Sequence, residues 1–235
     1  MADLRTQFAA RTADAVQIDE GLRKHMLKVY NYMASGVMLT FVVAWAVAQS
    51  PAVYAEVASL GWIVLLVAIG LVFFIGARIH RISPAAAQTC FWIYAALFGL
   101  ILSTYFVYFT GASIARVFFI TAATFGAMSL WGYTTKRDLS GLGSFLFMGL
   151  IGIIIAGVVN LFLLSSMLHF VVSVIGVLIF VGFTAYDTQK IKEMYLASDS
   201  VAVADKKAIL GALSLYLDFV LIFTYLMHLF GAANE

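Results

Sequence analysis

Long apolar blocks separated by short polar stretches dominate the chain. Seven blocks of about 17–25 residues carry few or no charges, and each is long enough to cross a hydrocarbon core of about 30 Å as an α-helix. The expected spans are residues 31–48, 61–78, 85–109, 112–133, 142–164, 168–188 and 208–230. The pattern predicts an all-α fold, a polytopic membrane protein built as a bundle of seven transmembrane helices.

Composition agrees with this pattern. The chain is 63% hydrophobic and 11% charged, whereas a soluble domain is about 45–50% apolar and about 25% charged. No G-x-x-x-x-G-K-[ST] loop is present, so an ATP-driven pump of that class is excluded. A single cysteine and four scattered histidines give no Cys/His metal spacing.

The distribution of basic residues predicts the orientation. Of the 14 Lys and Arg residues, 13 fall before the first span or in alternate loops, and only Arg116 breaks the pattern. The 13 are Arg5, Arg11, Arg23, Lys24, Lys28, Arg78, Arg81, Lys136, Arg137, Lys190, Lys192, Lys206 and Lys207. Because basic loops stay in the cytoplasm, the N-terminus is expected there.

Two regions are expected. Residues 1–29 form a cytoplasmic amphipathic segment, and residues 30–235 form the seven-helix transmembrane domain. The segment has two interpretations: a helix lying on the membrane or docked on the cytoplasmic face of the bundle, or a helical lead-in to the first span. Its apolar stripe consists of Ile18, Leu22, Met26 and Val29.

Small residues gather on one side of the fifth span, at Gly149, Gly152, Ala156 and Gly157. Gly152 and Ala156 have the four-residue spacing that lets membrane helices approach closely. We interpret this side as a packing surface.

Asp218 interrupts the last apolar block. Counted from Ala208, it lies ten residues into the span, or about 15 Å along the helix, close to mid-bilayer. A charged aspartate there costs at least about 2.5–3.5 kcal/mol. Asp218 must therefore face the bundle interior or water, have a partner, or be protonated; a purely structural hydrogen bond is the alternative to a functional role.

Asp187 lies near the cytoplasmic end of the sixth span, on the expected antiparallel neighbour of the helix that carries Asp218. Two carboxylates in one desolvated site cannot both ionise cheaply. A protonated pair would share a hydrogen bond, and an ionised pair would repel or attract a cation. Their oxygens suit a weak or transient Ca²⁺ site. The alternative is a local pair of Asp187 with Lys190 or Lys192.

Arg78 ends the second span on the same side. From a neighbouring helix it could reach Asp187, and the ion pair would close the cytoplasmic mouth as a latch. The alternative is an arginine that only extends to the interface and sets the orientation.

Four segments together resemble the bacterial branch of the Bax inhibitor-1 (transmembrane Bax inhibitor motif) family. They are TFGAMSLWGY at residues 124–133, TTKRDLSGLGSFL at 134–146, TAYDTQ at 184–189 and LYLDF at 215–219. The resemblance extends from about residue 20 to residue 230.

The resemblance implies a seven-helix bundle with the last helix central, and a pH-sensitive calcium leak through the membrane. It also implies that Asp187 and Asp218 form a pH-sensing pair, and that an arginine on the second span latches one of them. Arg78 is the position that best fits the latch.

The expected function is therefore a pH-sensitive calcium leak channel and not an enzyme. It would have no cofactor, with Ca²⁺ as the permeant ion, and its partners would be the lipid bilayer, calcium ions and protons, with no nucleic acid. One alternative is a non-conducting protein that binds other membrane proteins, for example membrane proteases. An intramembrane aspartyl protease is disfavoured, because Asp218 lacks the preceding Gly-x-Gly and neither Pro51 nor Pro84 precedes Ala-Leu.

Overall fold

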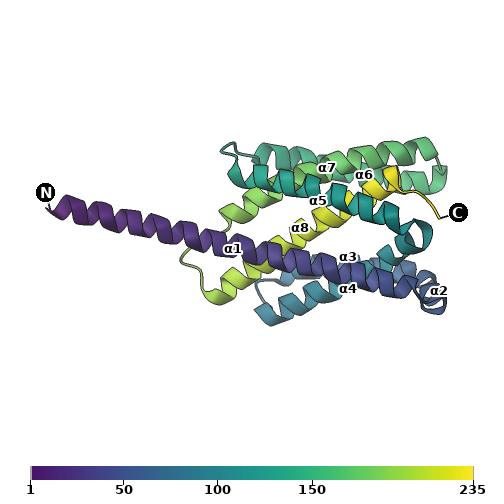
Figure 1. Cartoon of the computed structure of the whole chain (residues 1–235), viewed down its shortest axis with the longest axis horizontal. Coiled ribbons are helices and arrows are strands. Elements are labelled where there is room, and N and C mark those ends of the chain that lie inside the picture. The colour runs from purple at the N-terminus through teal and green to yellow at the C-terminus, as the bar shows by residue number, and fades with distance from the viewer. Residues whose placement is uncertain (1, 235) are drawn as a thin grey trace.

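The computed structural model describes the backbone of residues 2–234 and the side chains of residues 20–234. This part of the chain forms eight α-helices: α1 (Ala2–Ala48), α2 (Pro51–Ser59), α3 (Gly61–Arg78), α4 (Pro84–Tyr108), α5 (Gly111–Thr134), α6 (Ser140–Leu163), α7 (Ser166–Glu193) and α8 (Val201–Phe230). Seven of them, α1 from Glu20 onward and α3 to α8, are long and apolar enough to cross a membrane. The prediction of an all-α, seven-span protein is confirmed (Figure 1).

Serine and threonine caps explain where several helices begin. The hydroxyl of Ser83 accepts a hydrogen bond from the backbone of Ala86, and Pro84 occupies the first turn of α4. Thr110, Ser165 and Ser200 cap α5, α7 and α8 in the same way. Each cap satisfies a backbone N–H that lacks a partner within the helix.

The N-terminal half of the chain differs from expectation in two places. Helix α1 runs without a break through the expected boundary between residues 29 and 30. Met26 and Val29 are buried in the bundle core, which favours the lead-in interpretation, while Ile18 lies outside the described side chains. Helix α2 was not expected; it begins at Pro51 and buries none of its residues.

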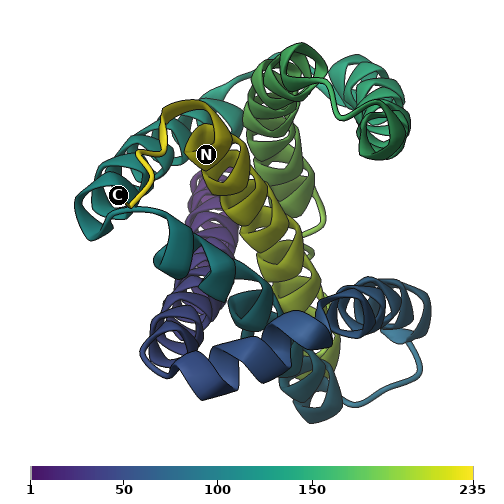
Figure 2. The ribbon, with the colours of Figure 1, turned by 90° about the vertical axis from the view of Figure 1, so that its right-hand side faces the viewer.

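Helix α8 lies at the centre of the bundle. It packs against α1, α4, α5 and α7, while α3 lies outside α4 and α6 outside α7 (Figure 2). About two thirds (67%) of the spanning window of α8 is buried, compared with 11% for α3 and for α6. Apolarity alone does not explain this enclosure, because α3 and α6 are more hydrophobic than α8 and lie outside. Helix α8 differs in carrying Asp218 in its interior, which lipid would surround only at a high cost in free energy.

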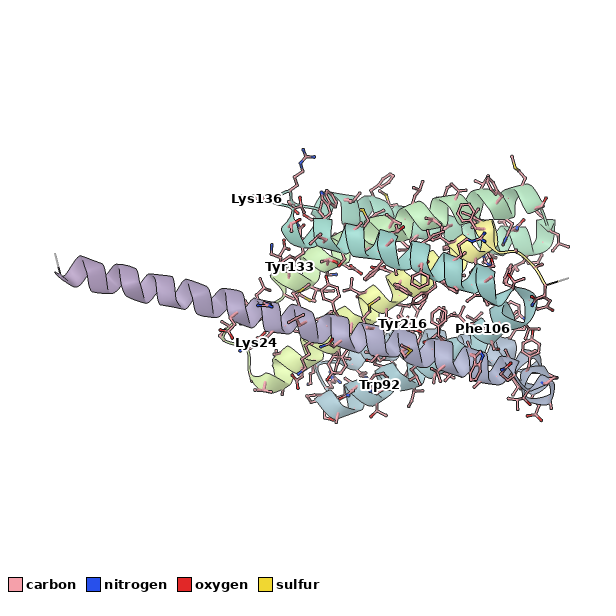
Figure 3. The ribbon with its side chains drawn as sticks, in the orientation of Figure 1. Lys24, Trp92, Phe106, Tyr133, Lys136 and Tyr216 are labelled. Carbon is pink, nitrogen blue, oxygen red and sulfur yellow. The ribbon has the colours of Figure 1, made fainter. Side chains whose placement is uncertain are left out.

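Tyr216 anchors α8 to two of its neighbours (Figure 3). Its ring meets Phe91 and Tyr94 of α4 edge to face, with centroids 5.8 and 5.7 Å apart. Its hydroxyl lies 2.6 Å from that of Thr40 on α1, which in turn donates to the carbonyl of Ala95 at 2.8 Å. The buried hydroxyl groups are therefore satisfied across three helices.

Close helix contacts occur at glycines other than those expected. A Cβ at Gly152 or Gly157 would meet open space, so the packing interpretation of the Gly152 position is wrong. Gly149 does contact a neighbouring helix, through Ile179 of α7. Among the glycines, the closest approach to the backbone of another helix is at Gly132 of α5, where a Cβ would overlap the backbone of Ala185.

The α5–α6 loop is fixed to α7 directly after Asp187. The side chain of Gln189 accepts a hydrogen bond from the backbone of Leu139 and donates one to the carbonyl of Arg137, both at 2.8 Å. Lys192 donates to the carbonyl of Tyr133 at 2.9 Å. We call the end of the bundle that carries this loop (residues 135–139) and the α7–α8 loop (residues 194–200) the basic end.

We predict that Gly132→Ala destabilises the protein by about 1–3 kcal/mol, because the new methyl group must push α5 away from the backbone of α7. Thermal unfolding in detergent measures the effect. Gly152→Ala, on an open face, is the matched control and should keep or slightly raise the unfolding temperature. Equal stability of both variants would contradict the close approach of α5 and α7.

A second prediction concerns the docked loop. Gln189→Ala leaves the buried N–H of Leu139 without its partner, so we expect a loss of about 1–3 kcal/mol in thermal unfolding. Gln189→Glu keeps the acceptor and should lose less. The exposed Glu193 on the same helix provides the control: Glu193→Ala should leave stability unchanged. A Gln189→Ala variant as stable as Glu193→Ala would show that the loop does not depend on these bonds.

Candidate functional site

The two predicted aspartates lie on α7 and α8, which pack against each other and run antiparallel, with α8 central and α7 toward the outside of the bundle. Ile191 packs on Gly211 near the basic end, and the ring of Tyr225 lies over Gly176 near the other end. In this register Asp187 lies about one helical turn from the level of Asp218. The sequence-based expectation of a pair on neighbouring helices is therefore geometrically possible.

Asp218 is buried in the interior of α8, with 3% of its surface exposed. Its neighbours in the helix, Leu217 and Phe219, are apolar, and its Oδ2 atom has no hydrogen-bond partner among the described residues. A buried carboxyl oxygen without a partner is costly, more so when ionised. The structural hydrogen bond considered as an alternative is not formed by this atom.

Asp187 is half-buried on α7, and Lys190 lies about one turn further along the same helix. Within the described side chains Asp187 forms no ion pair with Lys190 or Lys192. Lys192 is instead bound to the carbonyl of Tyr133, and Lys190 lies over the ring of Tyr186, 5.7 Å from its centroid.

The chemistry of this pair depends on its protons. Two ionised carboxylates repel strongly where water is scarce, whereas a shared proton converts the contact into a hydrogen bond. Among the described residues no group of three or more His, Cys, Asp or Glu side chains could hold a metal ion. The pair alone offers carboxylate oxygens, which fit a passing hard cation and not a tightly held one.

A chain of hydroxyl groups lies beside Asp187 and was missed in the sequence. Tyr30 of α1 lies 2.5 Å from the hydroxyl of Ser129 on α5, which lies 3.0 Å from that of Thr188 on α7. The chain connects three helices next to the candidate site. Ser129 and Thr188 are polar residues inside apolar spans, a signal that marks buried hydrogen bonds without indicating their partners.

Ion pairs hold the start of α8 in place and were also missed. Lys28 of α1 bonds to Asp205 at 2.5 Å, and Lys207 bonds to Asp199 in the α7–α8 loop at 2.6 Å. At the other end of the helix, the backbone of Ala232 pairs with Thr110. Helix α8 is thus fixed at both ends, with Asp218 between them.

Arg78 does not form an ion pair with Asp187 or Asp218 among the described side chains. It is exposed at the last residue of α3, a helix that packs on α4, and it forms no ion pair within the described part of the chain. The end of α3 instead lies near the start of α8, since Lys206 donates to the carbonyl of His80 at 3.3 Å. The structure therefore places Asp187 and Asp218 on adjacent helices, about one turn apart in depth. Among the described side chains it forms no ion pair between Asp187 and Arg78.

Comparison with known proteins identifies relatives of this arrangement. The family model described as inhibitor of apoptosis-promoting Bax1 matches residues 22–235. An uncharacterized protein of Rickettsia prowazekii is 46% identical over 98% of both chains. The inner membrane protein YbhL of Escherichia coli is 47% identical over 94% of this chain and 97% of its own, and an uncharacterized membrane protein of Streptococcus pyogenes is 38% identical over 92% and 95%. This chain, an integral membrane protein, thus belongs to the Bax inhibitor-1 family.

Proposed function

We propose that the protein is a passive, pH-regulated leak channel for Ca²⁺, with Asp187 and Asp218 as its proton sensor and transient cation site. The observation that carries this proposal is the buried Asp218, whose Oδ2 has no partner among the described residues and which lies about one helical turn in depth from Asp187 on the adjacent helix. Carboxylates inside a membrane bundle are rare and mark ion or proton pathways. The proposal is for transport without a cofactor and not for an enzyme.

The proposed cycle has two states. In the closed state Asp187 is ionised and pairs with Arg78, which requires α3 to move toward α7. Protonation of Asp187 removes that attraction, and the two aspartates then share a proton while Arg78 returns to the surface. The exposed position of Arg78 and the shallow burial of α3 support a helix that can move in this way.

We also propose that the protein resides in a bacterial inner membrane with the basic end in the cytoplasm. The printed name of the Escherichia coli relative supports the membrane. The alternation of basic loops supports the orientation, because lysine and arginine are retained on the cytoplasmic side.

Ca²⁺ entry into dye-loaded liposomes that contain only this protein tests the proposal. We expect the flux to rise as pH falls from roughly 8 to 5, by up to about tenfold per pH unit if one proton controls the opening. Asp187→Asn mimics the protonated residue and cannot pair with Arg78, so its flux should be high at every pH. Asp218→Asn should also remove the pH dependence, because the shared proton is lost.

Glu193→Gln supplies the matched control, since Glu193 is an exposed carboxylate on the same helix as Asp187. It should retain the wild-type pH profile. No flux above that of empty liposomes at any pH would overturn the channel and leave the non-conducting interaction protein as the better hypothesis. A wild-type profile in both asparagine variants would remove the sensor from this pair.

The latch makes a separate prediction. Arg78→Gln cannot attract an ionised Asp187, so its flux at pH 8 should rise toward the level that the wild type reaches at low pH. Arg81→Gln removes a neighbouring exposed arginine that the latch does not use, and its flux should match that of the wild type. If both variants behave alike, Arg78 has no specific role in closing the channel.

A further inference from the structure

A long apolar groove separates α1 from α5. Its volume is about 820 Å³, and nearly all of its lining is aliphatic or aromatic. Val37 and Phe41 form part of the α1 wall, Phe118 and Ala122 form part of the α5 wall, and Phe219 of α8 forms the floor. Phe219 follows Asp218 directly, so whatever fills this groove packs against the helix that carries the buried carboxyl group.

The groove continues toward the basic end of the bundle. A second hollow of about 530 Å³ shares Tyr30 and Phe125 with the first and is also lined by Arg23. From Tyr30 to Phe41 the α1 helix rises about 16 Å, close to half of a hydrocarbon core of about 30 Å. The α1 wall continues past Phe41 to Trp45, so the whole groove is deeper than one leaflet. The part nearest the basic end, from Tyr30 to Phe41, matches one leaflet in depth, and Arg23 lies beyond Tyr30 on the side of the basic end.

The charges near Arg23 are already compensated. Lys24 pairs with Glu20 at 2.8 Å, and Lys28 pairs with Asp205. Arg23 is exposed and forms no ion pair among the described side chains. An exposed guanidinium at the mouth of an apolar groove is complementary to an anionic headgroup carried on an acyl chain.

Other fillings of the groove are unfavourable. Water would find few hydrogen-bond partners along these walls, and an empty groove would forfeit the dispersion contacts of its lining. Helices α1 and α5 pack mainly against other neighbours, α1 against α4 and α8, and α5 against α7 and α8. The surrounding bilayer supplies acyl chains of the required length.

We propose that this groove binds one anionic phospholipid from the leaflet at the basic end. The headgroup pairs with Arg23, and an acyl chain lies between α1 and α5 with its side against Phe219. The bound lipid then acts as a structural part of the wall around α8. This lipid binding does not require that the protein conducts ions.

Lipid retention tests the proposal. The protein is reconstituted in nanodiscs of equal phosphatidylglycerol and phosphatidylethanolamine, extracted into mild detergent, and weighed with its bound lipids by native mass spectrometry. The wild type should retain a single phosphatidylglycerol. Ala122→Phe on α5 and Ala34→Phe on α1 fill the groove from opposite walls, and each should lose most of the retained lipid.

Matched controls separate this groove from the general lipid shell. Ala123 is the exposed neighbour of Ala122 and does not line the groove, so Ala123→Phe should retain lipid as the wild type does. Arg23→Gln should lower the preference for phosphatidylglycerol about fivefold, the effect of one cation at the membrane surface, whereas Arg81→Gln should not. Thermal unfolding checks that each variant is folded.

Three results would overturn the proposal. The first is equal lipid retention by the wild type and both groove-filling variants. The second is an unchanged headgroup preference in Arg23→Gln, and the third is retention of phosphatidylethanolamine as readily as phosphatidylglycerol by the wild type. If the groove-filling variants do not fold, the Arg23→Gln comparison alone decides.

Discussion

The carboxyl group of Asp218 constrains the rest of the structure, because it must be carried into the membrane on a helix that is otherwise apolar. Lipid cannot surround such a helix at low cost, and α8 is instead enclosed by α1, α4, α5 and α7. Tyr216, two residues earlier, contributes hydrogen-bonded and aromatic contacts to α1 and α4. Ion pairs at Asp205 and Asp199 hold the start of the helix. The position of α8 is thus fixed by several contacts, while Oδ2 of Asp218 has no hydrogen-bond partner among the described residues.

The spans could be predicted closely because the hydropathy of 20-residue blocks reports burial in lipid directly. The candidate pair could be predicted because consecutive spans joined by a short loop are antiparallel neighbours, which fixes the relative depth of Asp187 and Asp218. Helix α2 could not be found by the same reasoning, since it is short and buries no residue. The sequence also could not show whether α1 continues across residue 29, because a helical lead-in and a separate surface helix have the same amphipathic pattern.

Contacts that depend on which helices become neighbours could not be predicted from the sequence. The bonds from Gln189 to the α5–α6 loop join residues about fifty positions apart, and a glutamine near a span end carries no mark of its partner. Glycine spacing was misleading for a related reason: Gly152 fits a packing motif but faces open space, while Gly132, outside any such motif, meets the backbone of α7. The position of Arg78 belongs to the same class, since hydropathy places it at the end of a span without saying which helix lies beside it.

The depth of a charge and the identity of its neighbours are therefore separate questions, and function here depends on both. Its depth in the membrane makes an ionised Asp218 costly in free energy. Its neighbours determine whether that cost is reduced by protonation, by interaction with Asp187 or by a bound cation. Two neighbours of α8 bear on this choice: α7, which carries Asp187, and the groove that Phe219 helps to line. Side chains in a packed bundle transmit displacement through contact. A change in what fills the groove is therefore expected to displace Phe219 and, with it, the adjacent Asp218. Proton binding at the aspartates and the composition of the surrounding membrane would then act on the same helix, through adjacent residues.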